Sequence, residues 1–396
     1  MKSEPAEERQ KLWLFVGVAV LFAVVFAITL NRIPFIRLKS DFFVSWYAVR
    51  DFWQDGRNLY DPLVNHEVDM IVYGRDYEHY TGFYYPPHLV FLVGLVAWLP
   101  YPVAHVLWTT AVQLFMLFGL LMMIRTVHWP PRTSQTVLFL TLVMLSIPGL
   151  QVTIWGQYNT IAILSLALCY RALRQGKLGQ AGLWAIGLTF KPQNSLLLLL
   201  FLLLWAGLRR ERWRFLLSFG SGMAALGLAI TALQPDWPIE FLGALSRYIP
   251  VDSIVDRIWN PYQVTAVALL LASLAIFVRQ AAAKADSAAF AACLSLSLSL
   301  GALIVPIGGM FHVLPLIAGL VLLLAHFRQN VSGAYSKIVW GLLLLYAAGW
   351  VGFLAGFASG EHITWSGLAY ATLLPMAITG LALPVCLDLK WQPVQV

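Results

Sequence analysis

The stretch LWLFVGVAVLFAVVFAITL at residues 12–30 carries no charged side chain and decides which class of protein this is. At a rise of 1.5 Å per residue, its roughly 19 residues form a helix about 28 Å long, close to the hydrocarbon thickness of a bilayer. The preceding segment, Met1–Lys11, mixes acids with bases and lacks the basic start and small-residue cleavage site of a signal peptide. We therefore expect a retained membrane anchor.

Comparable apolar runs fill the rest of the chain. Of its 396 residues, 60% are hydrophobic and only 11% are charged, whereas soluble domains carry roughly 25% charged residues. About thirteen apolar segments can be drawn, and several are too short for length alone to show which of them cross. The basic loops can all be cytoplasmic only if one early segment does not cross, and 87–99, which is short and bounded by prolines, is the best candidate for a juxtamembrane or re-entrant helix. The sequence thus predicts an all-α polytopic membrane protein, a single integral membrane domain over 1–396 with about 12 transmembrane helices.

The charged residues divide between the two sides of the predicted bundle. Lys and Arg gather in short loops such as 171–177, 209–214 and 279–284, which the positive-inside rule places in the cytoplasm together with both termini. Carboxylates gather in the two longest polar segments, about 31–86 and 234–262. We therefore expect a multi-pass protein of the cell (inner) membrane with an extracytoplasmic active site. Because the excess of +7 lies mostly in those short loops, it does not indicate a nucleic-acid partner.

The first outer segment contains RLKSDFFVSWYAVRDFWQDG at residues 37–56, which predicts an amphipathic juxtamembrane helix on the outer leaflet. Ser40 or Asp41 suits its N-cap and Gly56 its end. A carboxylate at a helix N-terminus is favoured in its ionised form, which is the form that a general base needs. Asp41 is therefore a candidate catalytic base, and the alternative is that it only caps the helix.

Three further polar residues fall where apolar helices are expected to break. Lys191 follows the short apolar run 179–190, so it should lie below the interface, facing a cavity or an anionic partner such as a lipid phosphate. Snorkelling to the interface is the alternative. Gln157 and Asn159 belong to WGQYN at 155–159, an outer turn where substrate binding competes with hydrogen bonding between helices.

Four other residues are candidates for substrate binding, each with a structural alternative. His312 ends the Gly-rich stretch PIGGMFH at 306–312 and could equally be a packed histidine. Tyr60 and Tyr85 could stack on a sugar or belong to an interfacial aromatic cluster. Arg247 could contact phosphate or sugar, or lie on the surface of an interfacial helix.

Several signatures of other chemistries are missing from the sequence. It contains no GxxxxGK[ST], HExxH, paired CxxC or GxSxG pattern. Its three cysteines lie in or beside apolar segments, so no disulfide framework is expected. We therefore expect neither a metal nor a cofactor.

The order of the short motifs resembles that of a known family. LYDP at 59–62 is followed by YPP at 85–87, GQYN at 156–159, RQGK at 174–177 and KP at 191–192. This order is similar to that of the family 87 glycosyltransferases of the GT-C class, which include polyprenyl-phosphate-mannose-dependent α-mannosyltransferases. The resemblance covers a GT-C-like core at about 12–310 and leaves 311–396 as additional C-terminal transmembrane helices.

The resemblance implies an activity and a role for several residues. Such enzymes take a sugar, here most simply mannose, from a polyprenyl phosphate at the outer leaflet and pass it with inversion to a hydroxyl of a glycolipid or polysaccharide acceptor. Asp41 stands in the position of the base, with Asp51 as its rival, and Lys191 would face the donor phosphate. His312 matches a polar residue of the outer cavity only loosely. Membrane lipids are the remaining partners.

Two other classes of function compete with this interpretation. A transporter or flippase of a lipid-linked sugar would share the groove for the prenyl chain and the phosphate-binding cation. A non-enzymatic scaffold would explain neither Lys191 nor the outer segments. The carboxylate-rich first outer segment favours the transferase, because transport needs no acid–base group there.

Overall fold

The computed structural model describes residues 6–75, 82–129, 132–248, 261–304, 310–359 and 368–387. Within these ranges the chain forms helices joined by turns, with no β-strand. Five helical segments are long and apolar enough to cross a membrane. The predicted class, an all-α polytopic membrane protein, is confirmed.

The five candidate spans are distributed along the whole chain. They are Glu7–Asn31 of α1 (Ala6–Asn31), α6 (Tyr101–Val127), Arg210–Leu233 formed by η3 (Arg210–Arg212) and α12 (Trp213–Leu233), Met310–Asn330 formed by η4 (Met310–Val313) and α17 (Leu316–Asn330), and Gly333–Ser359 of α18 (Ser332–Ser359). A sixth results if α7 (Thr133–Met144) and α8 (Ile147–Trp155) form one span bent by 56°. The bend has a local cause, because Ser146 caps α8 and Pro148 lies in its first turn, where it cannot continue a preceding helix.

The other helices of the bundle are mostly shorter than a perpendicular crossing, which takes about 20 residues. They are α9 (Asn159–Arg174), α10 (Leu178–Ala185) with η1 (Ile186–Thr189), η2 (Pro192–Asn194), α11 (Leu196–Gly207), α15 (Pro261–Gln280), α16 (Ala288–Ile304), η5 (Leu368–Leu373) and α20 (Leu374–Cys386). The figure of about 12 crossings therefore stays a prediction. In the segment expected not to cross, α5 (Leu89–Ala97) has nine residues and is only about 14 Å long.

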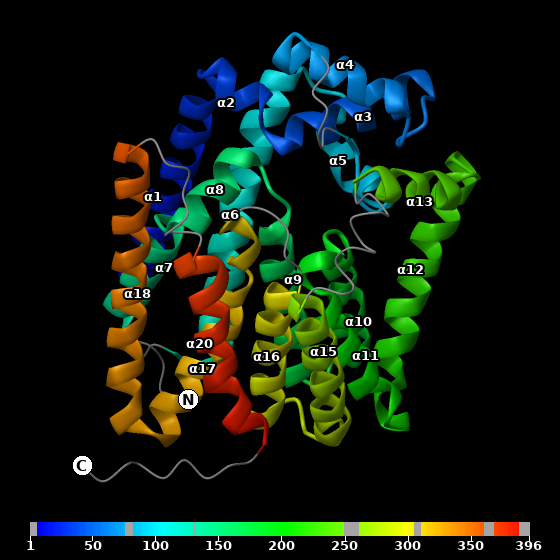
Figure 1. Cartoon of the computed structure of the whole chain (residues 1–396). Coiled ribbons are helices and arrows are strands. Elements are labelled where there is room, and N and C mark those ends of the chain that lie inside the picture. Colours follow the sequence, from blue (N-terminus) through cyan, green and yellow to red (C-terminus); the bar gives the residue numbers. More distant parts are fainter. Residues whose placement is uncertain are drawn as a thin grey trace.

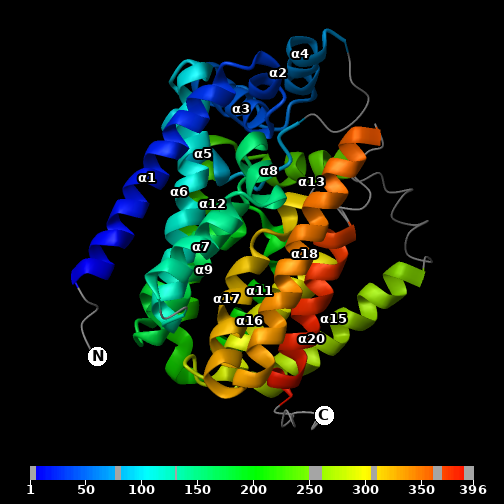
Figure 2. The same cartoon turned by 90° about the vertical axis from the view of Figure 1, so that its left-hand side faces the viewer.

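Short helices form a cap at one end of the bundle. The cap consists of α2 (Pro34–Leu38), α3 (Asp41–Asp55), α4 (Pro62–Tyr73), α5 and α13 (Trp237–Tyr248) (Figure 1). The N-terminal end of α1 points away from the cap, and the last turn of α20 lies at the opposite end of the bundle, as the side view also shows (Figure 2). The helix ends that carry Arg174, Arg279 and Arg328 point away from the cap as well. The first outer segment and the cytoplasmic loops predicted from charge are thus at opposite ends of the molecule.

Candidate functional site

The site begins at the first turn of α3. Ser40 is the N-cap residue, since its hydroxyl accepts a hydrogen bond from the backbone N–H of Phe42 at 3.2 Å. The helix ends at Gly56, whose φ of 65° is the left-handed conformation that glycine adopts without strain. Asp41 is therefore the first helical residue and not the cap. This excludes the interpretation of Asp41 as the capping side chain and leaves its carboxylate for another role.

The start of α3 is attached to the end of α8. The Ser40 hydroxyl donates to the carbonyl of Trp155 at 3.1 Å. Gly156 has a φ of 62°, and a Cβ built on it would lie 2.8 Å from the Cβ of Phe42, so only glycine fits at this approach. The indole of Trp108 on α6 stacks on Phe42 at 4.9 Å and donates to the Gly156 carbonyl at 2.8 Å. These contacts bring the WGQYN turn against Asp41.

A chain of polar side chains runs from Asp41 into the bundle. The amide nitrogen of Gln157 donates to Asp41 Oδ2, and Lys191 Nζ donates to the amide oxygen of Gln157. Lys191 also donates to Asn159 Oδ1 at 3.0 Å. Lys191 is only 4% exposed and forms no direct ion pair with a described carboxylate. Its ammonium is thus buried within the protein, and the amide of Gln157 connects it to the carboxylate of Asp41. Its depth in the membrane stays a prediction.

Lys191 reaches this position because the chain breaks around it. Pro192 follows it, and a residue before proline is displaced from the helical conformation; Lys191 has φ −136° and ψ 75°. The Ser195 hydroxyl donates to the carbonyl of Leu188 and, at 3.4 Å, to that of Lys191. The Ser195 hydroxyl thus supports the interruption between η1 and α11, where Lys191 lies buried.

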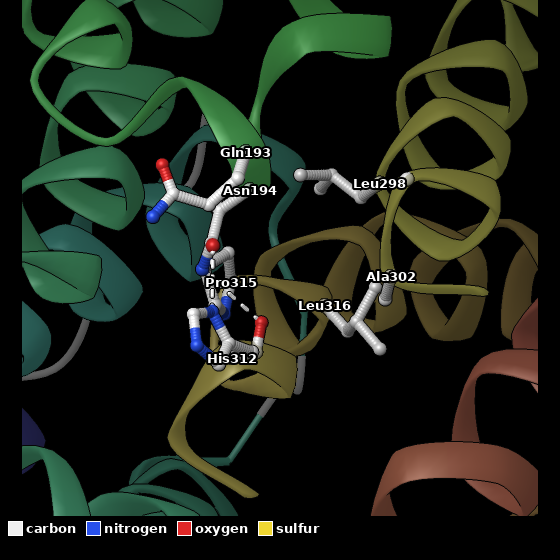
Figure 3. Close-up of a pocket in the computed structure, with 8 residues that line it drawn as sticks. Gln193, Asn194, Leu298, Ala302, His312, Pro315 and Leu316 are labelled. Atoms are coloured by element: carbon white, nitrogen blue, oxygen red, sulfur yellow. Dashed lines mark hydrogen bonds between the residues drawn. The ribbon is translucent and has the colours of Figure 1, made fainter. Parts of the chain in front are cut away.

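The short helix η4 closes the site from the other side. Asn159 Nδ2 donates to the Phe311 carbonyl at 2.9 Å, and Lys191 Nζ lies 4.9 Å from the centre of the Phe311 ring. The His312 ring lies 4.5 Å from that of Phe311. Asn194 contacts His312 twice, at its ring and at its carbonyl (Figure 3). Residues from α3, α9 and η4 thus meet around Lys191.

The electrostatics of this cluster favour a base near neutrality. Burial raises the pKa of Asp41 from its ordinary value to about 6, although the Lys191 charge and the Gln157 hydrogen bond act in the opposite direction. A carboxylate with such a pKa is ionised at neutral pH, yet it binds a proton more readily than an exposed aspartate.

The rival base lies in different surroundings. Asp51, on the same helix, is paired with Arg57 at 3.2 Å, and Arg57 is paired with Glu67 at 2.7 Å. The Tyr47 hydroxyl donates to Glu67 at 2.9 Å. Asp51 therefore belongs to an ion-pair group of α3 and α4 and is not joined to Lys191 by these contacts.

Tyr60, Tyr85 and Arg247 form a second group within the cap. The Tyr60 hydroxyl donates to the Tyr85 carbonyl at 2.9 Å, and Arg247 Nη2 donates to the Tyr60 carbonyl at 2.8 Å. Tyr60 is only 2% exposed. The Tyr85 ring lies 4.7 Å from that of Tyr158, the residue between Gln157 and Asn159. These contacts favour a role in holding α13 to the first outer segment, and substrate binding by the three stays a prediction.

Two residues of the site do not follow from sequence reasoning. Asn194 holds His312, and Tyr158 is fully buried between Tyr85 and Trp108. Only their place beside predicted site residues could have indicated them: Asn194 is three residues after Lys191, and Tyr158 lies between Gln157 and Asn159.

Two cavities adjoin η4. A small one of about 10 Å³ lies beside Asn194 and His312, with Leu298, Ala302 and Leu316 on its apolar side (Figure 3). A larger apolar groove of about 290 Å³ runs between α7, α8, η4, α17, α18 and η5. Its lining includes Val313 and Leu314, the two residues directly after His312.

No three His, Cys, Asp or Glu side chains converge as metal ligands within the described ranges. Cys169, Cys293 and Cys386 are buried, and they form no disulfide within the described ranges. The expectation of a metal-free reaction stays a prediction.

Comparison with known proteins identifies one family. A model of glycosyltransferase family 87 matches residues 83–306, more than half of the chain. The match contains Gln157, Asn159, Lys191 and Asn194, whereas Asp41 and His312 lie outside it. No curated protein and no solved structure matches.

Proposed function

The chain belongs to glycosyltransferase family 87, and from this premise we propose that it transfers a hexose, in the first instance mannose, from a polyprenyl phosphate to an acceptor hydroxyl. The reaction takes place on the extracytoplasmic face of the cell membrane and inverts the anomeric centre. Asp41 is the general base, and Lys191 faces the donor phosphate. The acceptor is a glycolipid or a polysaccharide.

One observation carries this proposal, the connection of Asp41 to Lys191 through Gln157. A transferase of this kind needs a proton acceptor at the attacking hydroxyl and a positive charge at the departing phosphate. The chain holds both within one polar cluster, and the amide keeps them from neutralising each other by direct contact.

The steps follow from these two groups. The acceptor oxygen attacks the anomeric carbon from the face opposite the phosphate, and its proton passes to the carboxylate of Asp41. The bond between the anomeric carbon and the phosphate oxygen breaks, and its electron pair leaves with the polyprenyl phosphate. General base assistance contributes about 10²- to 10⁴-fold to the rate.

Lys191 supplies the charge that the leaving group needs. An ammonium has three N–H donors, and two of those of Lys191 are used by Gln157 and Asn159. The third has no hydrogen-bond partner among the described residues and is available to a phosphate oxygen. A fixed charge in a site sheltered from water stabilises a developing anion more than the same charge in solvent does.

The apolar groove supports a lipid-linked donor. It is lined mostly by hydrophobic side chains of α7, α17 and α18, and Val313 and Leu314 belong to its lining. A prenyl chain in this groove would bring its phosphate next to η4, where Phe311 and His312 adjoin Lys191. A nucleotide sugar would have no use for such a groove.

The extracytoplasmic location is supported by the charge distribution. The candidate site begins at α3 of the cap, and the basic helix ends lie at the opposite end of the bundle. With those basic ends in the cytoplasm, the cap faces the outside and both termini are cytoplasmic.

The test is sugar transfer by the purified protein in nanodiscs. Radiolabelled polyprenyl-phosphate-mannose is incubated with a mixed glycolipid acceptor extract and with wild type, Asp41→Asn or Asp51→Asn. We expect labelled product from wild type and Asp51→Asn, and a loss of about 10²- to 10⁴-fold for Asp41→Asn. Full transfer by Asp41→Asn would exclude it as the base. If labelled donor crossed liposome membranes without any transfer, the flippase alternative would be right.

A further inference from the structure

The contact between Asn194 and His312 joins η2 to η4 by two hydrogen bonds to one side-chain amide (Figure 3). Asn194 Nδ2 donates to the carbonyl of His312 at 3.3 Å. Asn194 Oδ1 lies 2.9 Å from His312 Nδ1.

These two bonds determine where the imidazole carries its proton. A backbone carbonyl can only accept, so the end of the amide that faces it is the nitrogen. The other end is then the oxygen, which also can only accept. His312 Nδ1 must therefore be the donor, and in the neutral ring the proton is on Nδ1 and the lone pair is on Nε2.

The neighbouring groups keep this ring neutral. The Lys191 ammonium lies 4.9 Å from the centre of the Phe311 ring, and the His312 ring lies 4.5 Å from the same ring. A second positive charge at this position would face the first one in a buried cluster. The carboxylate of Asp41 is connected to Lys191 through Gln157, and among the described residues it forms no ion pair with His312.

We infer that Asn194 is a positioning residue that holds His312 in the Nδ1–H form, and that His312 Nε2 accepts a hydrogen bond from a hydroxyl group of the donor sugar. This inference rests on the proposed function. It gives separate roles to two residues that both adjoin Phe311: Lys191 binds the phosphate, and His312 recognises the sugar. An unprotonated Nε2 cannot donate a hydrogen bond to an ionised phosphate oxygen, whereas it can accept one from a sugar hydroxyl.

The position of η4 favours the donor sugar, rather than the acceptor, as the molecule whose hydroxyl binds His312. The residues directly after His312 line the groove assigned to the donor chain, whereas Asp41, which takes the acceptor proton, lies at the far end of the polar chain. The second ring nitrogen of His312 has no hydrogen-bond partner among the described residues and points away from Asn194 (Figure 3).

The first test reads the tautomer directly and does not depend on activity. Nitrogen NMR of protein labelled with ¹⁵N-histidine distinguishes Nδ1–H, Nε2–H and the imidazolium, and the His312 signal among the eight histidines is the one lost in His312→Gln. We expect Nδ1–H in wild type at neutral pH, and loss of that preference in Asn194→Leu. Gln193→Leu removes the adjacent amide and serves as the control, with the tautomer retained. A wild-type signal of Nε2–H or imidazolium would overturn the inference, even if no transfer activity were found.

The second test separates sugar from phosphate. Donors lacking one hydroxyl each are compared with the full donor. We expect wild type to disfavour one of them by about 3- to 10-fold in kcat/KM, and His312→Ala to lose that discrimination while binding polyprenyl phosphate as wild type does. If His312→Ala weakened polyprenyl phosphate binding as much as Lys191→Met does, His312 would be a phosphate ligand and the inference would be wrong.

Discussion

Asp41 and Lys191, 150 positions apart in the chain, bind opposite ends of one amide, that of Gln157. The nitrogen of the amide faces the carboxylate and its oxygen faces the ammonium. Because each end can bind only one kind of partner, the orientation of Gln157 is determined, and with it the carboxylate oxygen that remains for an incoming hydroxyl. Several predictions about the base, the cation and their supports depend on this relationship.

Gln157 should matter as a positioning residue. Gln157→Leu removes hydrogen bonds to two charged groups, each worth about 1.5–3 kcal/mol, and we expect kcat to fall by roughly 10- to 100-fold with little change in KM. Gln157→Glu places a second carboxylate beside Asp41 and should raise the pKa of Asp41 further. The acid limb of the pH profile would then move to higher pH. An unmoved limb would contradict the contact.

The pH dependence of transfer should report Asp41. Burial raises its pKa to about 6, and the base acts in its ionised form, so kcat/KM should fall as the pH is lowered through about 6 and level off above it. Measured profiles between pH 5 and 8 test this, with Asp41→Asn expected to show no such limb in its residual activity. A limb near pH 4, the value of an exposed aspartate, would mean that the carboxylate is solvated or that another base acts.

Removing the cation should affect the leaving group. Lys191→Met keeps the length of the side chain and removes its charge, and we expect kcat/KM to fall by about 10²- to 10³-fold. Lys177→Met, which removes an exposed lysine at the other end of the bundle, is the matched control and should remain active. Activity of Lys191→Met close to wild type would exclude the phosphate role.

Loss of the N-cap residue of α3, Ser40, should lower both the stability of the protein and its activity. Ser40→Ala removes the hydrogen bonds to Phe42 and Trp155, and loss of an N-cap costs about 0.5–2 kcal/mol, visible as a lower Tm. Activity should fall as well, since Asp41 is the next residue. Asp61→Ala removes the N-cap of α4, where the Asp61 carboxylate accepts a hydrogen bond from the backbone N–H of Leu63 at 2.9 Å. It should lower the Tm without a comparable loss of kcat; equal losses of kcat would contradict a local effect on Asp41.

The groove should select for the donor chain. Leu142 on α7 lines the groove, and Leu142→Trp would fill part of its volume. We expect kcat/KM for donors with long prenyl chains to fall several-fold, and that for donors with short chains to be retained. Equal effects on both donors would mean that the chain binds elsewhere.

The local part of the site could be predicted from the sequence because its signals act over a few residues. Ser40 and Gly56 delimit α3 as expected, through a side-chain cap and a left-handed glycine. Pro192 predicts a break at Lys191, and the helix is interrupted there, with Lys191 buried in the protein. The position of Lys191 below the membrane interface, which the short apolar run predicts, stays a prediction. The number of membrane crossings is harder to predict, since α9, α11 and α16 are shorter than the bilayer is thick.

The sequence by itself determined that this is a helical membrane protein, where its first outer helix begins and ends, and which polar residues lie at helix breaks. Only the tertiary structure decided that Asp41 and not Asp51 is connected to Lys191, that Gln157 joins them, and that Asn194 determines the proton position on His312. Caps, prolines and apolar runs act within one or two helical turns and are therefore legible in order along the chain. A contact across 150 residues depends on how α3, α9 and η4 pack, which no local pattern specifies.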